Sequence, residues 1–86
     1  MKKMNAIISL LIFQGQGENR QEVSFDKEFK EEVVALTRTI ATMCVKTKTL
    51  PIIGDSLSTE ERNYTVTNRD IACDPELEYT FYLEVQ

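Results

Sequence analysis

One long amphipathic stretch constrains the fold more than any other feature of the sequence. Between residues 26 and 48, apolar side chains recur at steps of three and four, the spacing that lines one face of an α-helix. Asp26 is placed to cap the N-terminus of this helix, and Pro51 sets the latest point at which it can end. We therefore predict one helix over about residues 26–48. Its apolar stripe consists of Phe29, Val33, Leu36, Ile40, Met43, Cys44 and, at its margin, Thr47.

Strand-like patterns flank this helix on both sides. The apolar run from Met4 to Phe13 precedes a glycine-containing turn, after which residues 20–25 form a weak, edge-like strand. Residues 77–85 alternate apolar and polar side chains with a period of two, and residues 64–73 are their partner across a turn at Asp74-Pro75-Glu76. The order β-β-α-β-β predicts an α+β fold, a small antiparallel sheet with one long amphipathic helix across one face.

The segment between the helix and the C-terminal hairpin, residues 49–63, is interpreted as an irregular connection. Within it, Ser58-Thr59-Glu60-Glu61 has the spacing of a helix capping box and predicts one short helical turn. An 86-residue chain can bury one thin core, so we expect a single domain over residues 1–86.

Composition excludes several classes of chemistry. The chain has no histidine, which removes Ser-His-Asp and Cys-His catalysis and histidine-ligated zinc. The four residues Gly54-Asp55-Ser56-Leu57 resemble the motif that names the GDSL hydrolases, but without a histidine Ser56 is better explained as a turn or cap residue. We predict no catalytic residue, no metal, no cofactor and no enzymatic activity.

Charge and hydropathy limit the partners. Fourteen acidic residues against ten basic ones give a net charge of −4, which opposes direct binding to nucleic acid. No stretch has the roughly 18 apolar residues that cross a membrane, so we expect a soluble, cytoplasmic protein with no membrane partner. The basic start and the apolar run that follows also resemble a short secretion signal; we favour the strand, and the signal remains the alternative.

The two cysteines show no metal-binding or redox motif, because Cys44 and Cys73 lie far apart in the sequence. We expect both to be buried, reduced thiols, because Cys44 falls within the apolar stripe of the helix. A single disulfide between them is the alternative.

The first strand is apolar on both faces, which a sheet with one covering helix does not require. Ile7, Leu11 and Phe13 point to one face, and the intervening residues point to the other. We assign Ile8, Leu10 and Ile12 to the face away from the helix and expect a second copy or a partner to bury them, which predicts a homo-oligomer. The alternative is a central strand whose outer face is partly exposed to solvent.

No known family is recognisable in the sequence, although in size and charge the chain resembles the small acidic proteins with which phages and mobile elements block host proteins. The leading hypothesis is a non-enzymatic protein-interaction module, an inhibitor or sequestering factor that binds a protein with a basic surface. The alternatives are a structural subunit and a module for an anionic, nucleotide-like ligand in a pocket between protomers. The expected partner-binding residues are Tyr82, Glu78, Glu84, Tyr64, Ile52 and Ile53, and the ligand alternative would use Lys46, Lys48, Arg62 and Arg69.

Overall fold

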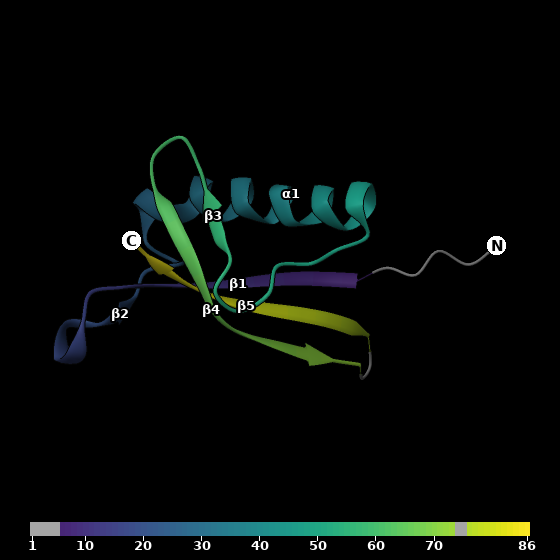
Figure 1. Cartoon of the computed structure of the whole chain (residues 1–86). Coiled ribbons are helices and arrows are strands. Elements are labelled where there is room, and N and C mark those ends of the chain that lie inside the picture. The colour runs from purple at the N-terminus through teal and green to yellow at the C-terminus, as the bar shows by residue number, and fades with distance from the viewer. Residues whose placement is uncertain (1–5, 74–75) are drawn as a thin grey trace.

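The computed structural model describes residues 6–73 and 76–86, which form one sheet and one long helix. The strands lie in the order β2-β1-β5-β4-β3, and α1 crosses one face of the sheet (Figure 1). The predicted α+β fold is confirmed. Its elements are β1 (Ala6–Gln14), β2 (Gln21–Glu22), α1 (Lys30–Thr47), β3 (Ser56–Ser58), β4 (Asn63–Ala72) and β5 (Leu77–Val85).

The sheet is mixed rather than antiparallel, and it has five strands rather than four. β1 runs parallel to β5, with Ala6 beside Leu77 and Phe13 beside Glu84, whereas the other neighbouring strands are antiparallel. Parallel pairing needs a long crossover, and the chain between these two strands supplies one that contains α1. The period-two pattern of a strand does not encode its direction, so the sequence could not reveal this pairing.

The helix forms close to its predicted position but starts differently. A single 3₁₀ turn at Lys27–Phe29 leads into α1, and the Asp26 side chain makes no capping hydrogen bond. The Asp26 backbone carbonyl instead accepts from the Phe29 N–H at 2.9 Å. α1 ends at Thr47, where Lys48 adopts a left-handed conformation with φ of 58°. No helix within the described ranges is long and apolar enough to cross a membrane.

The predicted second strand, residues 20–25, is shorter than expected. β2 has two residues, and the next two continue along β1 by hydrogen bonds: the Val23 N–H donates to the Ile12 carbonyl at 2.8 Å, and Ser24 Oγ accepts from the Ile12 N–H at 3.1 Å. The glycine-containing turn before β2 is confirmed. Gly15 has φ of +97°, and a Cβ atom there would collide with the backbone carbonyl of Asn19.

The predicted helical turn at residues 58–61 is wrong. Ser58 ends β3, and Thr59 Oγ1 then accepts from the N–H groups of Glu61 and Arg62, both at 3.1 Å. These bonds hold a tight turn into β4, so Thr59 stabilises a connection between strands, and no helix starts at Ser58. The C-terminal hairpin of β4 and β5 is confirmed; Met4, Asn5 and the expected turn residues Asp74 and Pro75 lie outside the described residues.

The core fills the space between α1 and the sheet face that it covers, which we call the inner face. Its buried side chains come from both the helix and the strands, and β1 contributes Leu10 and Ile12. The expectation that Ile8, Leu10 and Ile12 face away from the helix is therefore wrong. Both faces of β1 are apolar, so its pattern alone could not show which face α1 covers. The largest fully buried side chains are Tyr64, Phe29, Phe81, Ile12, Leu36, Ile40, Leu83 and Val66.

The cysteines are free, as expected, but they are exposed rather than buried. Met43 marks the stripe of α1 that faces the core, and one residue further along a helix turns by about 100°. Cys44 therefore lies on the flank of the helix, and Cys73 follows the end of β4.

We predict that both thiols of the native protein react with a thiol reagent without denaturant, because both side chains are exposed and neither is in a disulfide. Counting of free thiols by the Ellman reaction under native, non-reducing conditions should find two per chain. A count of zero in native and denatured protein alike would demonstrate a disulfide and contradict the structure.

Candidate functional site

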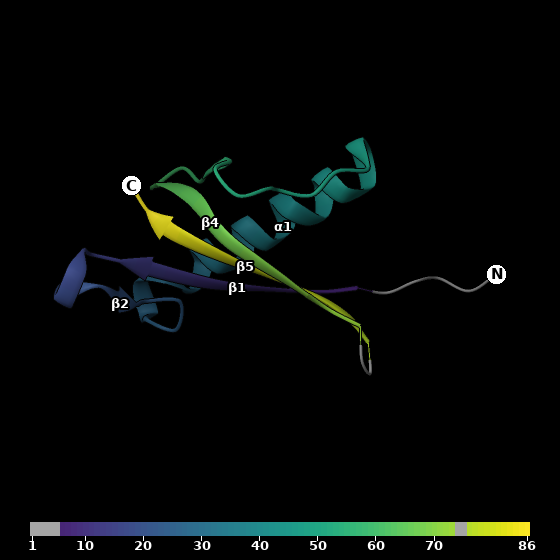
Figure 2. The same cartoon turned by 60° about the horizontal axis from the view of Figure 1, so that its bottom comes forward.

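The sheet face opposite α1 is not covered by another element of the described chain, and we call it the outer face (Figure 2). Strand register defines its members, because directly paired residues point to the same side of a sheet. Leu11 and Phe13 of β1 pair with Tyr82 and Glu84 of β5, and Asp70 of β4 pairs with Thr80. The outer face includes Ile7, Ser9, Leu11, Phe13, Glu22, Thr65, Asn68, Asp70, Ala72, Glu78, Thr80, Tyr82 and Glu84.

Two aromatic rings form the centre of the outer face. Phe13 and Tyr82 stack with their ring centroids 6.4 Å apart and their planes 12° from parallel. The Arg20 guanidinium lies 4.1 Å from the centre of the Phe13 ring and forms an ion pair with Glu84 at 3.3 Å. These contacts cross β1, β5 and the turn before β2, so they hold the rings in one arrangement.

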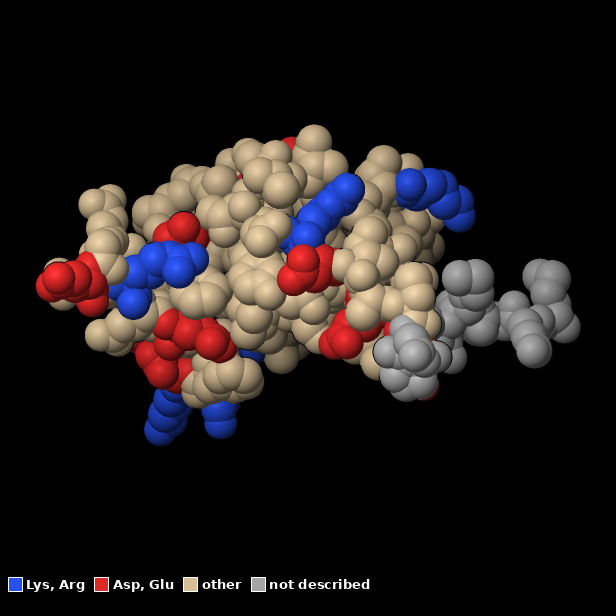
Figure 3. Space-filling view, turned by 90° about the horizontal axis from the view of Figure 1, so that it is seen from below, with Lys and Arg blue, Asp and Glu red and all other residues tan. Residues whose placement is uncertain are grey.

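Carboxylates surround this aromatic pair. The Tyr82 hydroxyl donates to Asp70 Oδ2 at 3.0 Å, and Ser9 Oγ donates to Glu78 Oε2 at 3.0 Å. The hydrogen bond to Asp70 and the charge of that carboxylate raise the pKa of Tyr82, so Tyr82 is a neutral donor at physiological pH. Viewed from this side, the surface is mostly uncharged, and acidic side chains lie along it together with several Lys and Arg side chains (Figure 3).

The structure brings together half of the expected partner-binding residues. Tyr82, Glu78 and Glu84 share the outer face of β5. Ile52 and Ile53 are 55% and 60% exposed, but they belong to the connection between α1 and β3 rather than to this face.

Tyr64 does not fit the expected role. It points to the inner face, opposite Val85, and is fully buried. A side chain with no exposed surface has nothing to offer a partner, so Tyr64 belongs to the core.

The four basic residues of the ligand alternative do not converge. Lys46 and Lys48 lie at the C-terminal end of α1, whereas Arg62 contacts Glu28 and Glu32 near its start, about 20 Å away along the helix axis. Arg69 donates to the Pro51 carbonyl at 2.9 Å. Within one copy of the chain, these residues form no common anion site.

A second cluster lies between α1 and the turn that joins β3 to β4. Glu32 is only 5% exposed, and its Oε1 atom accepts from the hydroxyls of Tyr64 and Thr59, both at 2.7 Å. Arg62 lies 3.7 Å from the same carboxylate and 4.3 Å from the centre of the Phe29 ring. The buried charge is thus hydrogen-bonded and paired, the condition under which burial of a carboxylate is tolerated.

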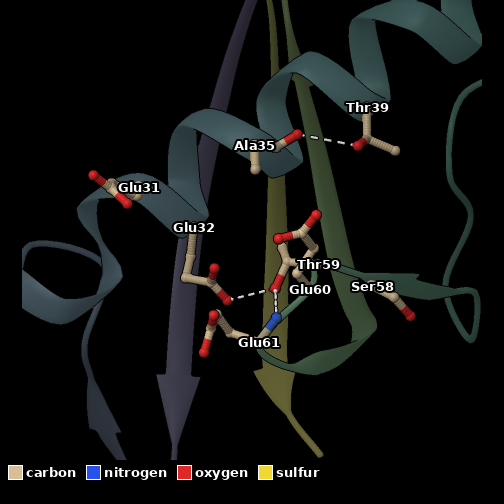
Figure 4. Close-up of a pocket in the computed structure, with 8 residues that line it drawn as sticks. All are labelled: Glu31, Glu32, Ala35, Thr39, Ser58, Thr59, Glu60 and Glu61. Carbon is tan, nitrogen blue, oxygen red and sulfur yellow. Dashed lines mark hydrogen bonds between the residues drawn. The ribbon is translucent and has the colours of Figure 1, made fainter.

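Glu32 and Thr59 of this cluster form the floor of a hollow of about 570 Å³ (Figure 4). Glu31, Glu60 and Glu61 line its rim, and Thr59 connects the floor to the β3–β4 turn. The Glu32 carboxylate accepts hydrogen bonds from Tyr64 and Thr59 and pairs with Arg62. Its role is therefore structural, because these contacts join the turn to the helix. The described residues contain no group of three or more Cys, Asp or Glu side chains arranged to hold a metal ion.

The sequence analysis missed several residues of these clusters. Phe13 and Asp70 were not recognised as partners of Tyr82, because their proximity depends on strand order. Glu32 carried a usable signal: it lies three residues after Phe29 and four before Leu36, which places a carboxylate on the apolar stripe.

Comparisons of the chain with protein families, with curated protein sequences and with solved structures found no match.

Replacement of Tyr64 by Phe should destabilise the protein, because it removes a donor from the buried Glu32 carboxylate. We expect the free energy of unfolding to fall by about 1–3 kcal/mol at neutral pH, measured by urea denaturation. Tyr79→Phe is the matched control, since no hydrogen bond of its hydroxyl is found within the described residues. The control should lie within about 0.5 kcal/mol of the wild type.

The same pair of proteins gives a test in alkali. Burial, followed by the hydrogen bond and charge of Glu32, raises the pKa of Tyr64 well above its ordinary value of 10.0. Tyr64 therefore ionises more readily in the unfolded chain, and the stability that it contributes is complete below about pH 10 and declines above it. The difference between wild type and Tyr64→Phe should narrow above pH 10; a constant difference would contradict the assignment.

Proposed function

We propose that the protein is a non-enzymatic interaction module that binds a basic surface of another protein through its outer face. The observation that carries this proposal is the stacked pair Phe13 and Tyr82, uncovered by any element of the described chain and surrounded by carboxylates. Aromatic rings supply much of the binding energy at protein interfaces, and surrounding charges select the partner.

The charge of the outer face supports a basic partner. Strand register places four carboxylates there, those of Glu22, Asp70, Glu78 and Glu84, and Arg20 is the cation that contacts them. This local excess of negative charge has the same sign as the net charge of −4 of the whole chain. Both fields attract a basic surface from a distance and repel nucleic acid.

The geometry of the ring pair supports binding with little reorganisation. Tyr82 is restrained by its hydrogen bond to Asp70 and by its contact with Phe13, and Phe13 is restrained by Arg20. Side chains that are already ordered lose little conformational entropy when a partner arrives. A rigid face that covers a basic surface also blocks whatever that surface would otherwise bind, which is the action of an inhibitor or sequestering factor.

The test begins with identification of the partner through the outer face itself. A photoreactive amino acid at Thr80, between Tyr82 and Glu78 on β5, should cross-link the full-length chain to one protein in a lysate of the source cell. The same amino acid at Thr42, which is exposed on α1, should not cross-link that protein.

Affinity measurements on the purified partner then test the chemistry. We expect Tyr82→Ala to weaken binding by tenfold or more, the size of effect seen for aromatic residues that dominate an interface. The double variant Glu78→Lys/Glu84→Lys should weaken it comparably at low salt. The double variant Glu31→Lys/Glu60→Lys makes the same change of charge on the opposite side of the molecule and should have a smaller effect.

Calorimetry in increasing salt completes this test. Binding by the wild type should weaken as salt screens the carboxylates, and the salt dependence should be reduced in Glu78→Lys/Glu84→Lys. Equal effects of the two double variants, or full affinity of Tyr82→Ala, would refute the outer face as the binding surface.

A further inference from the structure

The edge of the sheet formed by β1 is paired along only part of its length. At its C-terminal end, β2 pairs with Phe13 and Gln14, and residues 23 and 24 bond to both backbone groups of Ile12. Backbone groups alternate between the two edges of a strand, so those of Ile8 and Leu10 point to the same edge as those of Ile12. Within the described residues nothing pairs with Ile8 or Leu10 on that side, and Figure 2 shows β2 beside one end of β1 only.

An apolar groove of about 320 Å³ lies beside this open edge. Leu10 of β1 forms one wall, and Val33 and Val34 of α1 form the other; Ser24, Phe25 and Lys30 complete the lining. Phe25 and Val34 are 79% and 56% exposed, which places a large aromatic ring and a branched aliphatic side chain in solvent at the same edge. Soluble proteins usually shield such an edge with charges, proline or a covering element.

We propose that this open edge is a dimerisation site at which a second copy of the chain pairs its own β1 in antiparallel orientation. Two-fold symmetry brings identical edges together antiparallel, so the free N–H and C=O groups of each copy meet those of the other. The pairing joins two five-stranded sheets into one continuous sheet.

The edge is complementary to itself, which favours a second copy over an unrelated peptide. It carries an apolar hollow, and Phe25, which lines this hollow, also exposes most of its ring to solvent as a group that can fill another hollow. In a symmetric pair, the Phe25 ring of each copy can enter the groove of the other copy. The Val34 side chains of both copies are then covered. Two apolar side chains per copy and a short run of strand pairing form a small interface, so the dimer should be weak, with a dissociation constant in the micromolar range or above.

Dimerisation at this edge does not require the outer face. Edge pairing leaves both outer faces on the same side of the joined sheet, where they form one larger acidic surface. The two interactions also respond oppositely to salt: two chains of charge −4 repel each other, so salt should strengthen the dimer while it weakens binding of a basic partner.

The test is sedimentation equilibrium of the full chain over a dilution series from about 1 mM to about 1 μM, which spans weak association. We expect a mass that moves from two chains towards one on dilution. Val34→Lys places a charge in the groove and should weaken association by about tenfold or more, since a desolvated charge is costly. Val45→Lys is the matched control: the same substitution, on the same helix, at a residue 71% exposed that does not line the groove.

Amide hydrogen exchange tests the strand pairing directly. The N–H groups of Ile8 and Leu10 should exchange more slowly at high protein concentration than at low concentration, and this dependence should disappear in Val34→Lys. A mass of one chain at every concentration would overturn the proposal. So would a dimer that survives Val34→Lys but dissociates in Tyr82→Ala, because that dimer would use the outer face.

Discussion

A single helix can cover only one face of a sheet, and the rest of this structure depends on that constraint. Leu36 and Ile40 of α1, with Phe29 of the 3₁₀ turn before it, pack against the inner face, where they meet the buried side chains of β1, β4 and β5. Removal of this apolar surface from water is the main force that holds the layers together. No second layer covers the opposite face within the described residues, so its acidic side chains meet solvent (Figure 3).

The inner face also contains a polar contact that ties the helix to the sheet. Glu32 receives hydrogen bonds from Tyr64 and Thr59 and lies beside Arg62, so one carboxylate ties α1 to β4 and to the turn before it. Apolar packing alone would allow several positions of the helix on the sheet. A buried carboxylate is tolerated only beside its hydrogen-bond donors, so this contact selects one position. β4 also contributes to the outer face, where Asp70 accepts a hydrogen bond from Tyr82 of the neighbouring strand β5.

The sequence predicted those features that local periodicity encodes and failed at those that depend on strand pairing. The stripe from Phe29 to Met43 located the helix, and the alternation from Leu77 to Val85 located β5 with Tyr82 pointing outward. β1 is apolar on both faces, so nothing local distinguished Leu10, which is buried under the helix, from Leu11, which is not. The parallel pairing of β1 with β5 brings Phe13 into contact with Tyr82 on the neighbouring strand. No spacing of residues in the sequence predicts that contact.

The central claim is that one face of the sheet is buried and the other is open to solvent in the isolated chain. Paramagnetic relaxation by a soluble gadolinium chelate, measured by NMR on a dilute sample, tests it residue by residue. The account predicts strong relaxation of Tyr82, Phe13 and Thr80 side chains and weak relaxation of Ile12, Phe81 and Leu83. Equal protection of both sets would show that the outer face is already covered and would contradict the account.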